Sequence, residues 1–175
     1  MKKILIVVDM QKDFVDGALG TKEAIGIVDN VVAKIQGFDG DVIATYDTHG
    51  ENYMDTQEGK KLPVPHCIKG TDGWKLDKKV QEALDKKGFT EVYKPTFGSV
   101  DLVERIRKYD AENTQIQLIG LCTDICVVSN ALLLKANFPE MNISVDAACC
   151  AGVTPEKNLA ALETMRSCQI EVLNA

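Results

Sequence analysis

The sequence predicts an α/β protein built as a three-layer, doubly wound sheet of six parallel strands in the order 3-2-1-4-5-6. Two observations predict this class. Short apolar runs alternate with segments of helical period along the chain, and the runs are almost continuously apolar, as in strands that are buried on both faces. We expect strands at Lys3–Asp9, Asp41–Asp47, Thr90–Lys94, Gln115–Gly120, Asn142–Ala147 and Ile170–Leu173.

Amphipathic segments lie between the expected strands, and several begin at residues that cap helices. Thr21, Ser99 and Thr154 each stand at an expected N-cap position. Pro155 follows at a first helical position, where proline is favoured. No internal repeat, low-complexity tract or linker is present, so we expect residues 1–175 to form a single domain. We expect helices at Glu23–Gln36, Asp77–Lys87, Val100–Tyr109, Asp124–Asn137 and Glu156–Ser167.

Composition and charge exclude several classes of partner. The chain has 175 residues, of which 45% are hydrophobic and 26% charged, and its net charge is -6. This acidic balance argues against nucleic acid or an anionic membrane as partner, because both require a basic face. The apolar run Ile4–Val8 is shorter than the roughly 7–15 residues of a signal-peptide core, and no segment approaches the ~20 apolar residues of a membrane span. We therefore expect a cytoplasmic protein whose six cysteines are reduced.

Reactive side chains stand where the expected strands end. Strand one ends at Asp9, strand three ends at Lys94, and strand four leads into a turn that contains Cys122 and Cys126. Ligands bind open α/β sheets beyond the carboxyl ends of the strands, at the point where the strand order reverses. Strands one and four are neighbours at that point, and the long side chain of Lys94 reaches it from two strands away. The sequence therefore predicts that a carboxylate, an ammonium group and a thiol converge there.

Cys126 is the expected nucleophile. It lies in the first turn of the helix that follows Thr123 and Asp124, where free backbone N–H groups and the positive helix end favour a thiolate. The same N–H groups are suited to accept the oxyanion of a tetrahedral intermediate. Cys122 lies one turn earlier, and its backbone N–H is the expected second oxyanion donor.

The long irregular segment Thr48–Lys75 predicts a metal site. It contains both histidines of the chain, His49 and His66, and the first of them forms a D-x-H motif with Asp47 at the end of strand two. Two imidazoles with carboxylates suit Zn²⁺ or a similar ion with positions left for water and substrate. Three further carboxylates lie between the histidines: Glu51, Asp55 and Glu58.

Five motifs spread over nearly the whole chain together resemble the isochorismatase-like cysteine hydrolases. The sequences DTHGENY and PHCIKGTDGW in particular are similar to the nicotinamidase branch of that family. The resemblance implies the isochorismatase-like fold. The motifs are DMQKDF at Asp9–Phe14, DTHGENY at Asp47–Tyr53, PHCIKGTDGW at Pro65–Trp74, KPTFGS from Lys94, and GLCTDICV at Gly120–Val127.

The resemblance implies roles for individual residues. Asp9, Lys94 and Cys126 would form the catalytic triad. The resemblance also implies a non-proline cis peptide bond between Leu121 and Cys122, with the N–H groups of Cys122 and Cys126 as the oxyanion hole.

The resemblance likewise implies that Asp47, His49 and His66 hold a divalent metal ion. This chain lacks the third histidine of a common version of the family. Glu58 best fits that position, with Asp55 as the second choice. We expect zinc, with Fe²⁺ or Mn²⁺ as alternatives, because imidazole ligands favour these ions over Mg²⁺ and Ca²⁺.

The activity implied by the resemblance is hydrolysis of a small amide. We expect a cysteine-dependent amide hydrolase that converts nicotinamide and water to nicotinate and ammonia through a thioester on Cys126. Phe14 and Phe97 resemble the aromatic walls that enclose a flat ring, although core phenylalanine is the competing interpretation. Relatives in the family are often dimers or tetramers, so we expect a homo-oligomer.

Several alternatives stay open. The substrate could be another small amide, such as an N-carbamoyl or ureido compound, with the same triad. A vinyl-ether hydrolase is disfavoured because such enzymes lack the nucleophilic cysteine. A non-catalytic binding member of the fold is disfavoured by the intact triad. A papain-like Cys–His pair would need a histidine near Cys126, and both histidines lie in the expected metal loop.

Overall fold

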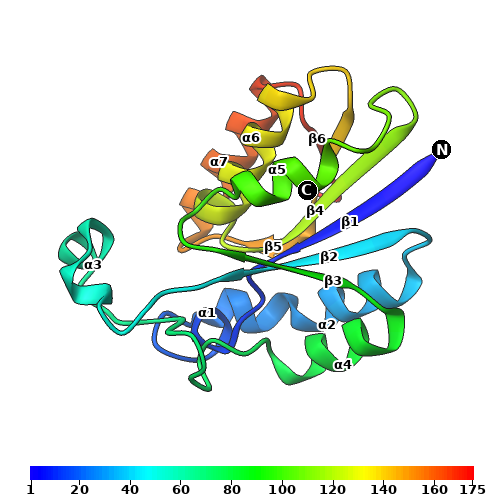
Figure 1. Ribbon diagram of the computed structural model, residues 1–175. Coiled ribbons are helices and arrows are strands. Elements are labelled where there is room, and N and C mark those ends of the chain that lie inside the picture. The colour runs from blue at the N-terminus through cyan, green and yellow to red at the C-terminus, as the bar shows by residue number, and fades with distance from the viewer.

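The computed structural model describes residues 1–175 and contains one six-stranded sheet (Figure 1). All strands are parallel and follow the order β3-β2-β1-β4-β5-β6, which confirms the predicted fold class and strand order. The order reverses between β1 and β4, as a doubly wound sheet requires. The strands are β1 (Lys2–Val8), β2 (Asp41–Asp47), β3 (Thr90–Lys94), β4 (Thr114–Leu121), β5 (Asn142–Ala151) and β6 (Glu171–Leu173).

Helices cover both faces of the sheet. One face carries α1 (Lys12–Val15), α2 (Lys22–Gly37) and α4 (Lys78–Lys87), and the other carries α5 (Val100–Ile106), α6 (Val128–Asn137) and α7 (Pro155–Ser167) (Figure 1). The predicted caps are present, because the hydroxyls of Thr21, Ser99 and Thr154 accept hydrogen bonds from the first turns of α2, α5 and α7. None of these helices has both the length and the apolar character that a membrane crossing requires.

The apolar period of two along the strands divides the core between the two faces. In β1, Ile4, Ile6 and Val8 pack toward α5, α6 and α7, whereas Leu5 and Val7 pack toward α2 and α4. All five side chains are fully buried. The central strands therefore have no solvent-facing side, and a ligand can reach their residues only at the ends of the strands.

Most element ends differ from the expected boundaries by a few residues, and two segments differ more. Strand β5 continues to Ala151 instead of ending at Ala147, because extra residues in β5 between Val145 and Cys150 shift the register, so that the end of β5 pairs again with the end of β4. The expected irregular segment also contains a 3₁₀ turn and the short helix α3 (Gln57–Lys61). Figure 1 shows α3 standing away from the sheet and its helical layers.

Candidate active site

The turn that follows β1 places Asp9 at the switch point of the sheet. Asp9 has a positive φ of 48°, which turns the chain sharply as it leaves the strand. Its carboxylate is fully buried and accepts a hydrogen bond of 2.6 Å from the hydroxyl of Thr45 on the neighbouring strand β2. Gly120 on the other neighbour, β4, allows close approach, because a Cβ atom there would lie 2.1 Å from the carbonyl oxygen of Val8.

Lys94, the last residue of β3, reaches across β2 to Asp9. Its Nζ lies 2.6 Å from Asp9 Oδ2 and 3.4 Å from the Sγ of Cys126. Burial lowers the pKa of Lys94, but the negative charge and hydrogen bond of Asp9, with a further contribution from Asp47, act in the opposite direction and leave its pKa above the ordinary value. The structure thus brings together the three residues that the sequence placed at separate strand ends.

Cys126 lies in a π-helical turn, Thr123–Val127, that continues into α6. Before this turn, the peptide bond between Leu121 and Cys122 is cis, as the family resemblance implies. The backbone N–H of Cys122 donates no hydrogen bond within the protein, so it is available to a ligand. These features put a buried thiol and a free amide at the same end of β4.

The expected thiolate at Cys126 is not favoured by the surroundings. Burial raises the pKa of the Cys126 thiol well above its usual value, and the negative charge of Asp9 raises it further. Lys94 acts in the opposite direction and is outweighed. Loss of hydration at this fully buried sulfur therefore opposes the helix-end effect that favours a thiolate. Burial also raises the pKa of Asp9 despite Lys94, which makes its carboxylate a stronger base than an exposed aspartate.

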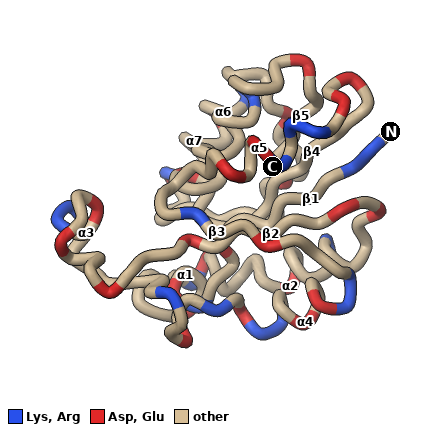
Figure 2. Tube along the Cα trace, viewed as in Figure 1, with Lys and Arg blue, Asp and Glu red and all other residues tan.

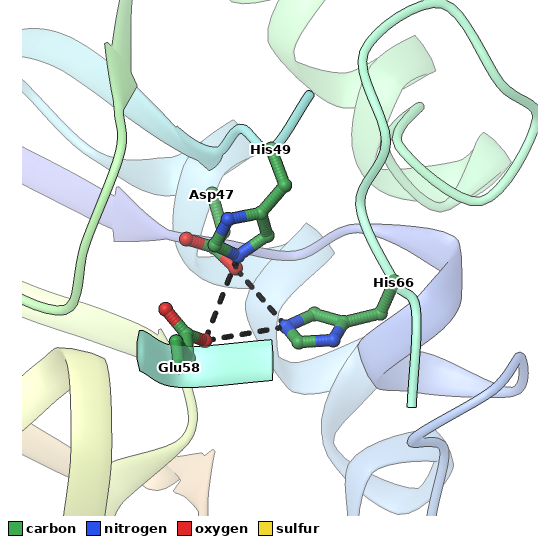
Figure 3. Close-up of side chains that lie close together, drawn as sticks. All are labelled: Asp47, His49, Glu58 and His66. Carbon is green, nitrogen blue, oxygen red and sulfur yellow. Dashed lines mark hydrogen bonds and ion pairs between the residues drawn. The ribbon is translucent and has the colours of Figure 1, made fainter. Parts of the chain in front are cut away.

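A second cluster lies beside the triad. Figure 3 shows Asp47, His49, Glu58 and His66 pointing toward one another. Asp47 Oδ2 lies 2.9 Å from His49 Nε2 and 3.4 Å from His66 Nε2. Glu58 Oε1 lies 3.6 Å and 3.7 Å from the same two nitrogens. Asp55, the second choice for the fourth ligand, is exposed and does not belong to the cluster.

The donor set and its spacing fit a transition-metal ion. A tetrahedral ion with bonds of about 2.1 Å has edges of about 3.4 Å, close to the separations between these atoms. The Nδ1 of His66 lies 2.7 Å from the carbonyl oxygen of Val64, so Nδ1–H donates there and Nε2 keeps its lone pair toward the cluster. Burial would raise the pKa of Asp47, but the neighbouring imidazoles of His49 and His66 and the charge of Lys94 lower it by a larger amount, so this carboxylate is ionised.

A small pocket joins the two clusters. Its wall contains Cys122 and Cys126 on the triad side and Asp47, Glu58 and His66 on the other side. The rest of the wall is apolar, and includes both phenylalanines that the sequence singled out: Phe14, Leu19, Leu62, Phe97 and Ile125. The arrangement can hold a small, mostly apolar molecule with one polar end near the thiol and another near the histidines.

Sequence reasoning missed two residues that hold these side chains in place. The side-chain amide of Gln11 donates 2.8 Å hydrogen bonds to the carbonyl oxygens of Asp47 and Trp74, and it accepts a 2.7 Å bond from the Asp47 N–H. Gln11 lies inside the DMQKDF motif, which was a usable signal. Thr45, the partner of Asp9, lies in the middle of an apolar strand and carried no signal.

Known proteins share this fold over its full length. The nicotinamidase/pyrazinamidase of Mycobacterium tuberculosis (strain ATCC 25618 / H37Rv) is 29% identical over 188 residues, covering 98% of each protein. The crystal structure of nicotinamidase/pyrazinamidase PncA from Bacillus subtilis has a TM-score of 0.86 at 28% identity, covering 99% of this chain and 100% of that chain. The crystal structure of pyrazinamidase of Pyrococcus horikoshii in complex with zinc has a TM-score of 0.78 at 24% identity, covering 100% of both chains, and shows the shared fold.

A family model, described as the isochorismatase domain, matches residues 3–175. The match includes every strand of the sheet, both side-chain clusters and the pocket between them. The resemblance that the five motifs carried is thereby confirmed over almost the whole sequence. The chain belongs to the isochorismatase domain family.

Proposed function

We propose that this protein is a cysteine-dependent amide hydrolase that converts nicotinamide and water to nicotinate and ammonia. One observation carries the proposal: a small, largely apolar pocket has a thiol with a base on one side and a two-histidine, two-carboxylate cluster on the other. A flat heteroaromatic ring fills such a pocket, with its carboxamide toward Cys126 and its ring nitrogen toward the cluster. The named relatives, nicotinamidase/pyrazinamidases, agree with this substrate class.

Acylation begins with proton transfer from Cys126 to Asp9. The raised pKa of Asp9 suits it to accept this proton as Sγ attacks the carboxamide carbon. The N–H groups of Cys122 and Cys126 stabilise the oxyanion that forms. When the oxyanion collapses, the C–N bond breaks, Asp9 returns the proton to the leaving nitrogen, and ammonia departs. An acyl thioester on Cys126 remains.

Deacylation reverses the roles. Asp9 takes a proton from water as the water oxygen attacks the thioester carbon, the C–S bond breaks, and the proton returns to Sγ. Lys94 stays protonated throughout, because its position 2.6 Å from Asp9 and 3.4 Å from Sγ stabilises negative charge on either group. The triad thus cycles one proton without a histidine.

Asp47, His49, Glu58 and His66 would hold a divalent metal ion, and we propose zinc. When bound, the ion supplies a Lewis-acidic position for a ring nitrogen. Two imidazole donors support zinc, iron or manganese over magnesium or calcium. The hydrogen bond from His66 to Val64 supports a ligand role because it orients the ring with Nε2 inward.

We further propose that Phe14 and Phe97 are the walls that enclose the ring. Phe14 is buried and its ring centroid lies 5.5 Å from that of His66, while Phe97 comes from the loop after β3. Two expectations stay predictions: the cytoplasmic location that the apolar pattern of the sequence predicts, and the dimer or tetramer that the resemblance implies. Sedimentation of the purified protein tests the second.

Incubation of the purified protein with a panel of amides tests the activity. Ammonia and the acid product are measured for nicotinamide, pyrazinamide, and N-carbamoyl and ureido compounds. We expect the highest kcat/KM with the heteroaromatic carboxamides. Release from the N-carbamoyl or ureido compounds alone would replace the nicotinamidase assignment by the other amidase class. Release from none of them, with a metal-loaded protein, would contradict amide hydrolysis.

A further inference from the structure

The loop after β3 carries a wall of the pocket but is weakly tied to the sheet. It runs from Pro95 to Gly98, directly after Lys94, and contains Phe97. No backbone–backbone hydrogen bond joins residues 95–98 to any part of the protein. Phe97 is 43% exposed, so burial of its ring does not hold the loop in one position. Side-chain interactions must therefore position Phe97 relative to Cys126.

Two side chains supply that connection. Lys94 Nζ donates a 3.1 Å hydrogen bond to the carbonyl oxygen of Thr96. Asn130 Nδ2 donates a 3.1 Å hydrogen bond to the carbonyl oxygen of Phe97, and Asn130 Oδ1 accepts a 2.9 Å bond from the N–H of Ser99. Asn130 therefore forms hydrogen bonds with the loop on both sides of Gly98. The third hydrogen bond to the loop comes from the triad residue Lys94.

Asn130 also contacts the nucleophile segment. It lies on α6, one helical turn after Cys126, is fully buried, and donates a 2.8 Å hydrogen bond from Nδ2 to the Cys126 carbonyl oxygen. Both Nδ2 hydrogens and the Oδ1 acceptor are thus used. One planar amide joins the helix of Cys126 to the loop of Phe97.

Asn137 on the same helix shows what an ordinary helical asparagine does. Its Nδ2 donates a 2.9 Å hydrogen bond to the Leu133 carbonyl oxygen, four residues earlier, and its side chain is exposed. The bond from Asn130 to Cys126 has the same spacing. The two bonds from Asn130 to the loop have no counterpart at Asn137, so they are the feature to explain.

Packing against α6 does not replace these bonds. A Cβ atom at Gly98 would meet the side chain of Leu133 at 3.5 Å and the carbonyl oxygen of Ser129 at 3.6 Å, which are ordinary contact distances. At Gly98 the loop therefore lies beside α6 and contributes no side chain to the contact. Directional hydrogen bonds are what set its position along the helix.

We infer that Asn130 is a positioning residue, which sets the place of the Phe97 wall relative to the Cys126 nucleophile and so determines how tightly the ring of the substrate is held. The inference rests on the proposed function for the role of Phe97. Asn130 does not touch the reacting atoms. Its loss should therefore weaken substrate binding more than it slows the chemical steps.

Asn130→Thr tests the inference, with Asn137→Thr as matched control. Threonine can still bond the carbonyl oxygen four residues earlier, so both variants keep that bond, but Asn130→Thr loses the two bonds to the loop. We expect KM to rise about 2- to 10-fold in Asn130→Thr, and by no more than in Phe97→Ala, with kcat within about twofold. Asn137→Thr should match the wild type. A purely structural loss of folded enzyme would lower kcat and leave KM unchanged.

Hydrogen exchange gives a readout that needs no substrate. The Ser99 N–H and its neighbours at 96–102 should exchange faster in Asn130→Thr, while amides of β1 keep wild-type protection. Phe97→Ala supplies the second check, because Asn130→Thr should add little to its KM if Asn130 acts through Phe97. Should Asn130→Thr fail to fold, Asn130→Ser replaces it with the same expectations.

Each outcome decides. An unchanged KM in an active Asn130→Thr variant overturns the inference, and so does an equal KM rise in Asn137→Thr or full additivity with Phe97→Ala. If the wild type hydrolyses no amide, the proposed function fails separately. The exchange at Ser99 then decides alone: faster exchange confined to 96–102 supports the positioning role, and wild-type exchange there overturns it.

Discussion

The two ends of the pocket are built in different ways. The triad comes from residues at the ends of β1 and β3 and from the turn after β4, so the central sheet holds all three. The proposed metal cluster takes only Asp47 from the sheet. His49, Glu58 and His66 come from the long excursion between β2 and α4.

The outer part of that excursion has little support. Helix α3, which carries Glu58, stands away from the body in Figure 1, and Figure 2 shows that it bears both acidic and basic residues. Its main anchor is Tyr53, which is buried, contacts both histidine rings at 4.9–5.0 Å, and donates a hydrogen bond to the Leu62 carbonyl oxygen. The positions of the triad residues are therefore set by the sheet. The positions of His49, Glu58 and His66 are set by the path of the loop between β2 and α4.

Lys94 links the two ends. Its Nζ lies 2.6 Å from Asp9 and 3.7 Å from Asp47, so one buried ammonium is shared between a triad carboxylate and a cluster carboxylate. Glu58 has no such partner, and burial raises its pKa. The geometry of the triad should therefore persist without any bound ion, whereas the geometry of the cluster should depend on one. The following predictions test that difference.

Cys126→Ala should have the largest effect. Without the thiol no thioester forms, so turnover should fall to the uncatalysed rate, measured as ammonia release, and no acyl adduct should appear by mass spectrometry. The metal content should stay at the wild-type level, because Cys126 is no part of the cluster. Cys122→Ala should keep a substantial part of the activity, since only its backbone is used. Full activity in Cys126→Ala would end the covalent mechanism.

Asp9→Asn should keep the fold and lose the base. We expect kcat to fall about 10²–10⁴-fold, the usual scale for a positioned acid–base group. Circular dichroism and thermal unfolding serve as the check that the sheet is intact. Wild-type turnover in this variant would make Asp9 a structural residue that only pairs with Lys94 and Thr45.

Glu58→Ala should act on the metal and spare the triad. We expect at least a 10- to 100-fold weaker affinity for zinc, by analogy with the loss of groups that support metal ligands. Asp55→Ala is the control, because this carboxylate is exposed and lies outside the cluster. Metal content of protein purified without a histidine tag, and titration after chelation, measure the difference. Equal affinities in both variants would remove Glu58 from the ligand set.

Phe97→Ala should have the smallest effect. The side chain is 43% exposed, so the free energy of unfolding should change by less than about 0.5 kcal/mol. Loss of one aromatic contact to the ring should raise KM about 2- to 10-fold. Steady-state kinetics and chemical denaturation measure the two quantities. An unchanged KM would mean that Phe97 does not contact the substrate.

The sequence alone predicted the sheet and the convergence of the triad because both follow from local patterns. Alternation of apolar residues in β1, the capping residues Thr21, Ser99 and Thr154, and parallel strands with one common carboxyl edge are properties of short segments. Once the strand order is known, Asp9 and Lys94 must meet at that edge. The position of both histidines in one long irregular segment after Asp47 likewise identified that segment as a candidate metal site.

Only the tertiary structure decided the finer points. The raised pKa of the Cys126 thiol depends on burial from all sides, which no local pattern reveals. The inclusion of Glu58 instead of Asp55 depends on the path of α3. The hydrogen bonds of Gln11 and Asn130 join segments far apart in the chain. Residue type and spacing determine which groups stand at the end of each strand, but loop paths and packing determine which atoms come within hydrogen-bonding distance.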